Sequence, residues 1–249
     1  MNIAILLSGG TGARLGGNIP KQYIEVGGKP VIIYIPKQYI EVGGKPVIIY
    51  CLQTLNRSKL IDKIQIVASD EWVPKINAWT KKFGVDSKIC GYSNPGKNRQ
   101  LSIYNGLVDI KSFVEDDDNI FIHDAARPNL SLSTIEITFE AIKGYDGVIP
   151  VLPMKDTVYL SKDGLEIDSL LKRQEIFAGQ APETFVYGKY IAANQKLVDS
   201  GEIIKINGST EPAVKAGMKI HMIAGDEFNF KITTIDDLER FKEQIKAIK

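Results

Sequence analysis

A glycine-rich stretch near the start of the chain carries the residue types best suited to chemistry. Residues 2–7 are mostly apolar and predict a short strand, after which glycines dominate. Glycines adopt positive φ readily and lack Cβ atoms, so their backbone N–H groups can close around a phosphate chain. Arg14 and Lys21 add two cations, and this combination suits a triphosphate that is attacked at its α-phosphorus. The stretch predicts a nucleotide site that includes Leu7, Ser8, Gly9, Gly10, Thr11 and Gly12.

Two widespread phosphate-binding patterns do not fit this stretch. The P-loop pattern G-x-x-x-x-G-K-[ST] is absent, because Lys21 comes too late and no Ser or Thr follows it. The dinucleotide-binding pattern G-x-G-x-x-G is absent as well, and no acidic residue closes a strand about 20 residues further on. A flexible surface loop after a strand is the alternative interpretation.

The composition argues against several classes of protein. The chain has 249 residues, of which 44% are hydrophobic, and a formal net charge of +1. This length allows an ample core, and the near-neutral charge gives no electrostatic case for a nucleic-acid or membrane partner. The two cysteines lack C-x-x-C spacing, and no apolar run approaches about 18 residues. These features predict a cytoplasmic protein with reduced thiols.

Residues 19–34 recur without a single change as residues 35–50. Each copy contains Pro-Lys-Gln-Tyr, an extended run, a Gly-Gly turn, and a Lys-Pro step into an apolar run that can begin a helix. A natural repeat array needs at least about three units, so two identical copies indicate a recent duplication, a cloning change or a sequence error. Looping out one copy adds little closure entropy, so the fold can survive it.

The duplication offers one catalytic lysine twice, as Lys21 and as Lys37. Lys21 is tethered directly to Arg14 and the glycine-rich stretch. Lys37 belongs to the copy that is contiguous with the predicted helix over residues 47–55. We slightly favour Lys37, because the second copy keeps strand, turn and helix together as one unit.

A second concentration of polar residues follows the apolar residues 120–122. His123 and Asp124 end this predicted strand, and Arg127 follows. The carboxyl ends of parallel strands commonly carry the site of an α/β protein. Adjacent strand residues point to opposite faces, which argues against a joint metal pair or a Ser-His-Asp triad. Asp124 is therefore expected to bind substrate hydroxyls or a magnesium ion, and His123 is expected to be structural.

Further cations lie near other element boundaries. Arg99 and Ser102 open a predicted helix, where N–H groups and the helix dipole favour anions, although an ordinary helix cap fits equally well. Lys231 follows Phe228, Asn229 and Phe230 just before the last predicted helix. Any positive potential must be local, around Arg14, Lys21, Arg99, Arg127, Arg173 and Lys231.

The order of elements predicts one α/β domain over residues 1–249, with a largely parallel sheet. Residues 154–180 read as a protruding hairpin arm that cannot bury its apolar face alone, which suggests a partner subunit. Ser69 is expected to cap one helix, and Ser133 with Glu136 reads as a capping box for another. Residues 85–90 are expected to form a strand.

Several motifs together resemble one family, the 2-C-methyl-D-erythritol 4-phosphate cytidylyltransferases, which include ribitol-5-phosphate cytidylyltransferases. The resemblance covers the chain apart from the additional 16 residues of the duplication. The opening stretch and the run His-Asp-Ala-Ala-Arg-Pro are specific in combination. The supporting motifs are Pro-Lys-Gln-Tyr, Arg99 to Ser102, Asp156-Thr157 and Phe230-Lys231-Ile-Thr-Thr.

The resemblance implies a Rossmann-like nucleotidyltransferase fold, a homodimer joined by exchanged β-arms, and Mg²⁺ with CTP. It implies that a polyol phosphate attacks CTP, giving a CDP-polyol and pyrophosphate, and that positioning and charge suffice without a general base. The implied catalytic residues are Arg14, Lys21 or Lys37, and Lys231. Gly96, Arg99 and Ser102 would bind the nucleotide, whereas Asp124, Arg127, Thr157 and Arg173 would bind the acceptor, with Arg173 reaching the neighbouring subunit.

The motifs near the implied acceptor site depart from the family pattern. Lys97 stands where many relatives carry an acidic residue, and Ala181-Pro182-Glu183 replaces a more usual Thr-Pro-Gln. The substrate contact among Ser209, Thr210 and Glu211 stays open. 2-C-methyl-D-erythritol 4-phosphate, for isoprenoid precursor synthesis, is the first acceptor expected, with ribitol 5-phosphate for surface polysaccharides as the alternative. Two rival interpretations are a catalytically impaired nucleotide-binding protein and a nucleotidyltransferase that uses another base.

Overall fold

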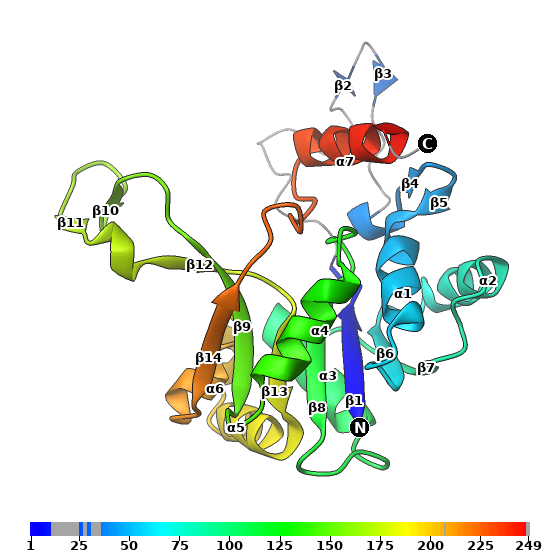
Figure 1. Cartoon of the computed structure of the whole chain (residues 1–249), viewed down its shortest axis with the longest axis horizontal. Helices are drawn as coiled ribbons and strands as arrows, with labels where there is room; N and C mark the ends of the chain where they lie inside the picture. The colour runs from blue at the N-terminus through cyan, green and yellow to red at the C-terminus, as the bar shows by residue number, and fades with distance from the viewer. Residues whose placement is uncertain (11–24, 27–28, 31–35, 207, 248–249) are drawn as a thin grey trace.

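A mostly parallel sheet, flanked by helices, forms the centre of the protein (Figure 1). The computed structural model describes residues 1–10, 25–26, 29–30, 36–206 and 208–247. Within these residues the sheet has eight strands, in the order β12-β9-β13-β8-β1-β6-β7, with β14 paired to β9. The strands are β1 (Asn2–Leu7), β6 (Lys63–Val67), β7 (Ile89–Ser93), β8 (Asn119–Asp124), β9 (Gly147–Pro153), β12 (Phe177–Gly179), β13 (Glu183–Val186) and β14 (Ile220–Ala224).

The strand pairings confirm the predicted α/β class. β1 is parallel to both β6 and β8, β6 is parallel to β7, and β14 is parallel to β9. β13 and β12 run antiparallel to their neighbours. The α-helices of the described residues are α1 (Val47–Arg57), α2 (Val73–Lys82), α3 (Arg99–Asp109), α4 (Leu132–Ala141), α5 (Tyr187–Asp199), α6 (Glu211–Lys215) and α7 (Ile235–Ala247).

Alternating side chains of the central strand β1 serve two separate cores. Ala4 and Leu6 pack with apolar residues of α1, α2 and α4, whereas Ile3 and Ile5 pack with those of α3, α5 and α6. All four side chains are fully buried, as expected for a strand covered by helices on both faces. The end of β1 is consequently held from both sides, which makes it a rigid base for the loop that follows.

Two predicted element starts are wrong. Ser131, not Ser133, caps α4, and its Oγ accepts a hydrogen bond from the Thr134 backbone N–H at 3.0 Å. No side chain caps α2, which begins after Trp72 rather than at Ser69. The strand expected over residues 85–90 is β7, Ile89–Ser93. Short polar residues cluster near both helix starts, so the local pattern alone did not show that Ser131 caps α4 and that no side chain caps α2.

The second copy of the duplicated segment joins the fold next to α1. It forms the turn η3 (Lys37–Tyr39) and the hairpin of β4 (Glu41–Val42) and β5 (Lys45–Pro46). Gly43 and Gly44 make its two-residue turn with φ of 60° and 87°, a conformation that favours glycine. Val42 and Val47 pack with Phe241 of α7, which lies over this hairpin. In the first copy, β2 (Glu25–Val26) and β3 (Lys29–Pro30) form an equivalent hairpin.

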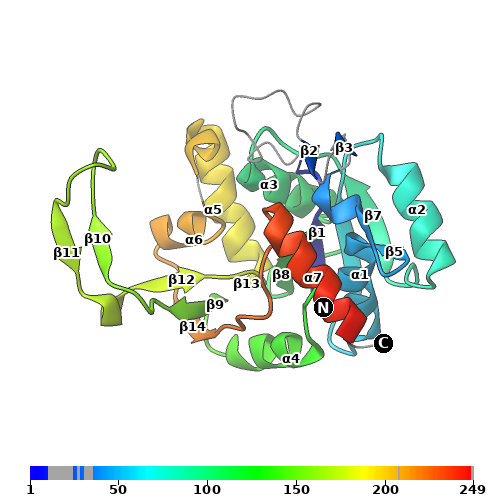
Figure 2. The same cartoon turned by 90° about the horizontal axis from the view of Figure 1, so that it is seen from above.

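A long arm leaves the body of the protein after β9 (Figures 1 and 2). Its tip is the antiparallel pair β10 (Val158–Leu160) and β11 (Ser169–Leu171), followed by the short helix η4 (Arg173–Glu175). Leu165, Ile167 and Leu170 on the arm are 89%, 64% and 66% exposed. The predicted hairpin arm is therefore present, and its apolar side chains face solvent in the single chain.

Deleting one copy of the duplicated segment is expected to stabilise the protein by about 1 kcal/mol, because it shortens the connection between Gly10 and Pro36. Deleting residues 19–34 or residues 35–50 gives the same polypeptide, since the copies are identical. Urea unfolding of this variant beside the full chain measures the difference. A substantial loss of stability would show that the first copy packs against the fold.

Candidate functional site

A pocket of about 460 Å³ opens at the carboxyl ends of β1 and β8 and at the start of α3. It is lined by Leu7, Gly9, Gly10, Gln38, Pro95, Gly96, Lys97, Asn98, Arg99, Ser102, Asp124, Ala126 and Lys231. Many of the residues singled out from the sequence thus meet in one place, although they come from four distant segments. Arg14, Lys21, Thr11 and Gly12 lie outside the residues that the structure describes.

The second copy contacts the end of β1 directly. The Gln38 amide donates hydrogen bonds to the backbone oxygens of Ser8 and Gly10, at 2.6 and 3.1 Å. The Ser8 hydroxyl donates to the Tyr39 hydroxyl at 2.7 Å, and the Tyr39 hydroxyl donates to the Ser8 carbonyl at 2.9 Å. Tyr39 also stacks on Trp72, with 4.2 Å between the ring centroids. These contacts place Lys37, the neighbour of Gln38, beside the glycine-rich stretch.

Two glycines allow the loops around the pocket to approach closely. A Cβ atom on Gly9 would lie 2.4 Å from the Pro95 Cβ, and one on Gly96 would lie 2.3 Å from the Leu101 Cβ. The Gly96 N–H donates to the Ser102 Oγ at 3.0 Å. Gly96 and Ser102, both predicted as nucleotide-binding residues, are therefore held together on one wall of the pocket.

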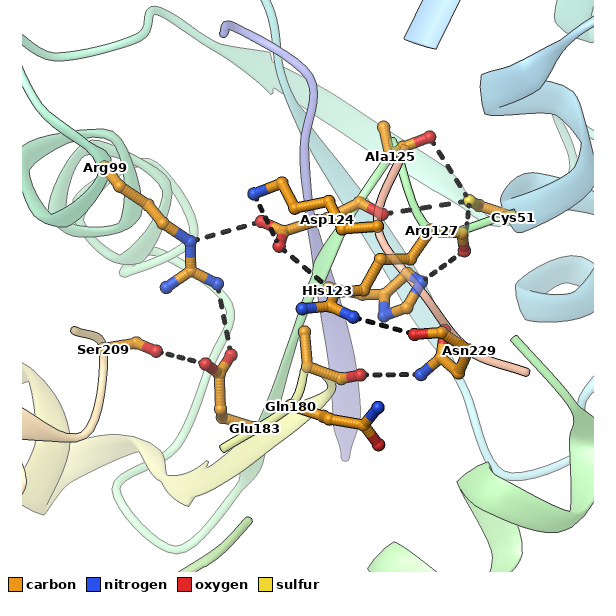
Figure 3. A network of polar contacts seen from close by, with 12 residues as sticks. Cys51, Arg99, His123, Asp124, Ala125, Arg127, Gln180, Glu183, Ser209 and Asn229 are labelled. Carbon is orange, nitrogen blue, oxygen red and sulfur yellow. Dashed lines mark hydrogen bonds and ion pairs between the residues drawn. The ribbon is translucent and has the colours of Figure 1, made fainter. Parts of the chain in front are cut away.

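Asp124 lies at the centre of a cluster of positive charges (Figure 3). Its Oδ1 is 3.2 Å from the Arg99 Nε, and its Oδ2 is 3.0 Å from the Lys231 Nζ and 3.5 Å from the Arg127 Nε. Burial acts to raise the pKa of Asp124, but the charges of Arg99, Lys231 and Arg127 outweigh it and hold the pKa well below its usual range. Asp124 is consequently ionised at any physiological pH.

Glu183 extends this cluster, and sequence reasoning did not assign it a role. The Arg99 Nη2 donates to the Glu183 Oε2 at 3.2 Å, and the Ser209 hydroxyl donates to the other carboxylate oxygen. Glu183 is only 8% exposed and Ser209 only 2%. Glu183 stands at the start of a short strand-forming run, β13, and a carboxylate that is buried there requires a positively charged or hydrogen-bonding partner. This position was the feature of the sequence that could have indicated the contact. Arg99 is thus bound between two carboxylates at the edge of the pocket, and its predicted contact with the nucleotide stays a prediction.

His123 lies behind the pocket and is fully buried. Its ring Nε2 is 3.0 Å from the Arg127 carbonyl oxygen, and burial lowers its pKa to about 4. The ring is therefore neutral at physiological pH and donates from Nε2. This agrees with the structural role expected for His123.

The two predicted arm residues do not line the pocket of their own chain. Thr157 and Arg173 are exposed, and the Arg173 guanidinium donates to the Lys155 carbonyl oxygen at 2.8 Å.

Among the described residues, no group of three or more His, Cys, Asp or Glu side chains is arranged to hold a metal ion. No helix within the described part of the chain is long and apolar enough to cross a membrane.

A family comparison covers most of the chain, including the whole second copy. The model of the 2-C-methyl-D-erythritol 4-phosphate cytidylyltransferase (IspD) family matches residues 33–246. The chain belongs to the IspD family. It is therefore a nucleotidyltransferase of the cytidylyltransferase kind, and the resemblance seen in its motifs is confirmed.

Relatives within the IspD family carry two different acceptor names. A ribitol-5-phosphate cytidylyltransferase of Streptococcus agalactiae serotype V is 27% identical over 97% of this chain and 94% of the relative. A 2-C-methyl-D-erythritol 4-phosphate cytidylyltransferase of Geotalea uraniireducens is also 27% identical, over 98% of this chain and 97% of the relative.

Solved structures of the IspD family share the fold. The 4-diphosphocytidyl-2C-methyl-D-erythritol synthase of Anaerococcus prevotii matches with a TM-score of 0.78 and 24% identity, over 98% of this chain and 96% of that one. The 2-C-methyl-D-erythritol 4-phosphate cytidylyltransferase of Francisella tularensis matches with a TM-score of 0.75 and 24% identity, over 98% of this chain and 99% of that one.

Replacing the two duplicated lysines separately is expected to have unequal effects. Because the second copy contacts the end of β1, we expect Lys37→Ala to lower kcat at least about 100-fold and Lys21→Ala to leave it within a few-fold. Pyrophosphate release from CTP measures both. Equal losses of kcat in the two variants would contradict the expectation that only one of the two lysines acts in the site.

Titration of His123 should make stability fall as the solution becomes mildly acidic. Its folded pKa of about 4 lies below the ordinary 6.5, so its contribution is complete above pH 6.5 and is lost as the pH falls toward 4. Between pH 7 and pH 5 the loss should be about 2 kcal/mol, measured by urea unfolding.

The control for this titration is the second histidine of the chain. His123→Asn should abolish this part of the pH dependence, whereas His221→Asn should retain it. An unchanged slope in the His123 variant would mean that another group titrates.

Proposed function

We propose that this protein transfers a cytidylyl group from CTP to the phosphate of a polyol phosphate, releasing pyrophosphate. The observation that carries the proposal is the cluster in which Arg99, Arg127 and Lys231 surround Asp124; Arg99, Asp124 and Lys231 line the pocket at the end of β1. Three cations against two carboxylates, counting Glu183, leave an excess of positive charge for a phosphate group.

The reaction suits a pocket built from charges rather than from an acid–base pair. A phosphate oxygen of the acceptor attacks the α-phosphorus of CTP, and the bond from that phosphorus to the β-phosphate oxygen breaks. A phosphate monoester is already anionic at neutral pH, so no residue has to remove a proton from it. Positioning and stabilisation of the developing charge then supply the rate enhancement.

The residues divide between the two substrates. Gly96 and Ser102 are proposed to bind the nucleotide, with the backbone around Gly9 and Gly10 against its phosphates. Arg14 and the Pro-Lys-Gln lysine, Lys37 in preference to Lys21, would stabilise the pentavalent phosphorus.

On the acceptor side, Asp124 would accept hydrogen bonds from acceptor hydroxyls, and Lys231 would turn from Asp124 toward the acceptor phosphate. Arg99 is proposed to orient Asp124 rather than to bind phosphate, because two carboxylates already hold it.

Mg²⁺ is proposed to enter with CTP. Mg²⁺ commonly binds through substrate phosphates, water and one or two carboxylates, so it needs no dedicated protein cluster. The oxygens of Asp124 are engaged by three cations, which makes the triphosphate the better source of ligands. Bound there, the ion would neutralise phosphate charge, and chelation should remove activity.

Two acceptors have specific support. 2-C-methyl-D-erythritol 4-phosphate is the first candidate, because the family model and the solved relatives carry its name; the product would serve isoprenoid precursor synthesis. Ribitol 5-phosphate is the second, because relatives named for it match 97% of the chain, and its product would serve surface polysaccharides. Both have one phosphate and a chain of hydroxyls, which fits one carboxylate beside several cations.

A screen of nucleotides and acceptors tests the proposed function. Pyrophosphate release is measured with CTP, UTP, ATP and GTP, each with 2-C-methyl-D-erythritol 4-phosphate or ribitol 5-phosphate. We expect turnover only with CTP, and at least about tenfold higher kcat/KM for the first acceptor. Higher kcat/KM for ribitol 5-phosphate would reverse the choice of acceptor. CTP binding without turnover on either would indicate a nucleotide-binding protein.

The arm supports a homodimer. Its exposed apolar residues Leu165, Ile167 and Leu170 would be covered by a second copy, and Arg173 would then reach the acceptor phosphate of that neighbour. Light scattering should give twice the mass of one chain. A clean monomer would remove Arg173 and Thr157 from the proposed site.

A further inference from the structure

Hydrogen bonds from β8, from α1 and from the segment before α7 hold the backbone of the turn at residues 124–127. The Arg127 N–H donates to the Asp124 carbonyl oxygen at 3.0 Å, and the Ile232 N–H donates to the Ala126 carbonyl oxygen at 2.8 Å. The Ala125 and Arg127 carbonyl oxygens face two buried side chains, Cys51 and His123. The Asp124, Ala126 and Arg127 carbonyl oxygens therefore each accept a hydrogen bond within the protein, and the Ala125 oxygen faces the Cys51 thiol.

Cys51 of α1 supplies the contacts that reach this turn from the neighbouring helix (Figure 3). Its Sγ lies 3.3 Å from the Arg127 carbonyl oxygen, 3.6 Å from that of Ala125 and 4.0 Å from that of Asp124. Burial and the nearby Asp124 charge raise the pKa of the Cys51 thiol, so it keeps its proton and can donate. One thiol proton serves one acceptor at a time, and the Arg127 oxygen is the nearest.

His123 adds a second donor to the same oxygen. Its Nε2 is 3.0 Å from the Arg127 carbonyl, and its Nδ1 has no hydrogen-bond partner among the described residues. Two buried donors, from α1 and from β8, thus converge on one carbonyl oxygen. This fixes the turn from which the Asp124 side chain reaches Arg99 and Lys231, and from which the Arg127 side chain reaches Asp124 and the Asn229 carbonyl oxygen.

We propose that Cys51 is a positioning residue for the transfer reaction: by holding the backbone of the 124–127 turn, it sets where Asp124 and Arg127 meet the acceptor. This inference rests on the proposed function for its kinetic consequence. The geometry also links the two halves of the site, because Cys51 lies on the helix that directly continues the second copy. Movement of that copy would be passed through α1 to the turn.

The experiment compares Cys51→Ala with Cys51→Ser, which differ by one hydroxyl donor. With saturating CTP, we expect Cys51→Ala to lower kcat/KM for the acceptor about tenfold, while the KM for CTP changes less than about twofold. Cys51→Ser should stay within about threefold of the wild type, because its hydroxyl can donate to the same oxygen. Equal kcat/KM in Cys51→Ala and the wild type would overturn the proposal.

A matched control separates positioning from loss of stability. Leu55→Ala removes another fully buried side chain of α1 that belongs to the same core. It should lower the Tm at least as much as Cys51→Ala while leaving kcat/KM for the acceptor unchanged. If Leu55→Ala lowered kcat/KM equally, the effect would be general destabilisation and the proposal would fail.

Backbone hydrogen exchange gives a readout independent of activity. Cys51→Ala should accelerate exchange of the Arg127 and Ile232 amides, whose acceptors lie in the turn, and should leave the β1 amides unchanged. Unchanged exchange at Arg127 and Ile232 would contradict the positioning role even if the wild type proved inactive. If the wild type proved inactive and Cys51→Ala still accelerated exchange of these two amides, the proposed function would be wrong and the positioning of the turn by Cys51 would stand.

Discussion

The attraction between Asp124 and its three cations is the interaction on which the site depends. Each of Arg99, Arg127 and Lys231 is delivered by a different element, namely the start of α3, the turn after β8 and the segment before α7. One buried carboxylate therefore joins three parts of the chain that would otherwise repel one another. Removing it would leave like charges close together in a poorly hydrated place, a far larger disturbance than the loss of one surface ion pair.

The same interaction explains why the pocket is preorganised for an anion. Glu183 binds Arg99 and is itself held by the Ser209 hydroxyl, so the guanidinium is oriented without a bound substrate. Lys231 is 37% exposed at its side chain and is bound to Asp124 through one ammonium group. It is the member of the cluster best able to exchange partners, since its flexible stem reorients more easily than a guanidinium held between two carboxylates.

The sequence predicted the residues that belong to recognisable local patterns. The α/β class followed from the order of predicted strands and helices, and five residues predicted for the site line one pocket, namely Gly96, Arg99, Ser102, Asp124 and Lys231. Cys51 and Glu183 were not assigned roles, because what matters about them is a partner far away in the chain. Arg99 and Glu183 are 84 residues apart, and Cys51 and Arg127 are 76 apart, so no local spacing reveals either contact.

Helix α1 determines which of the two identical copies occupies the place beside β1, and so gives the chain a single native state. Two identical segments offer the same side chains to one place on the fold, so their local contacts alone are degenerate. Only the second copy runs straight into the buried residues Cys51, Leu52 and Leu55 of α1. Seating the first copy there would interrupt that helix with Pro36, which lacks the N–H that a helix interior requires. A proline inside the repeat thus breaks the symmetry between two otherwise equivalent registers.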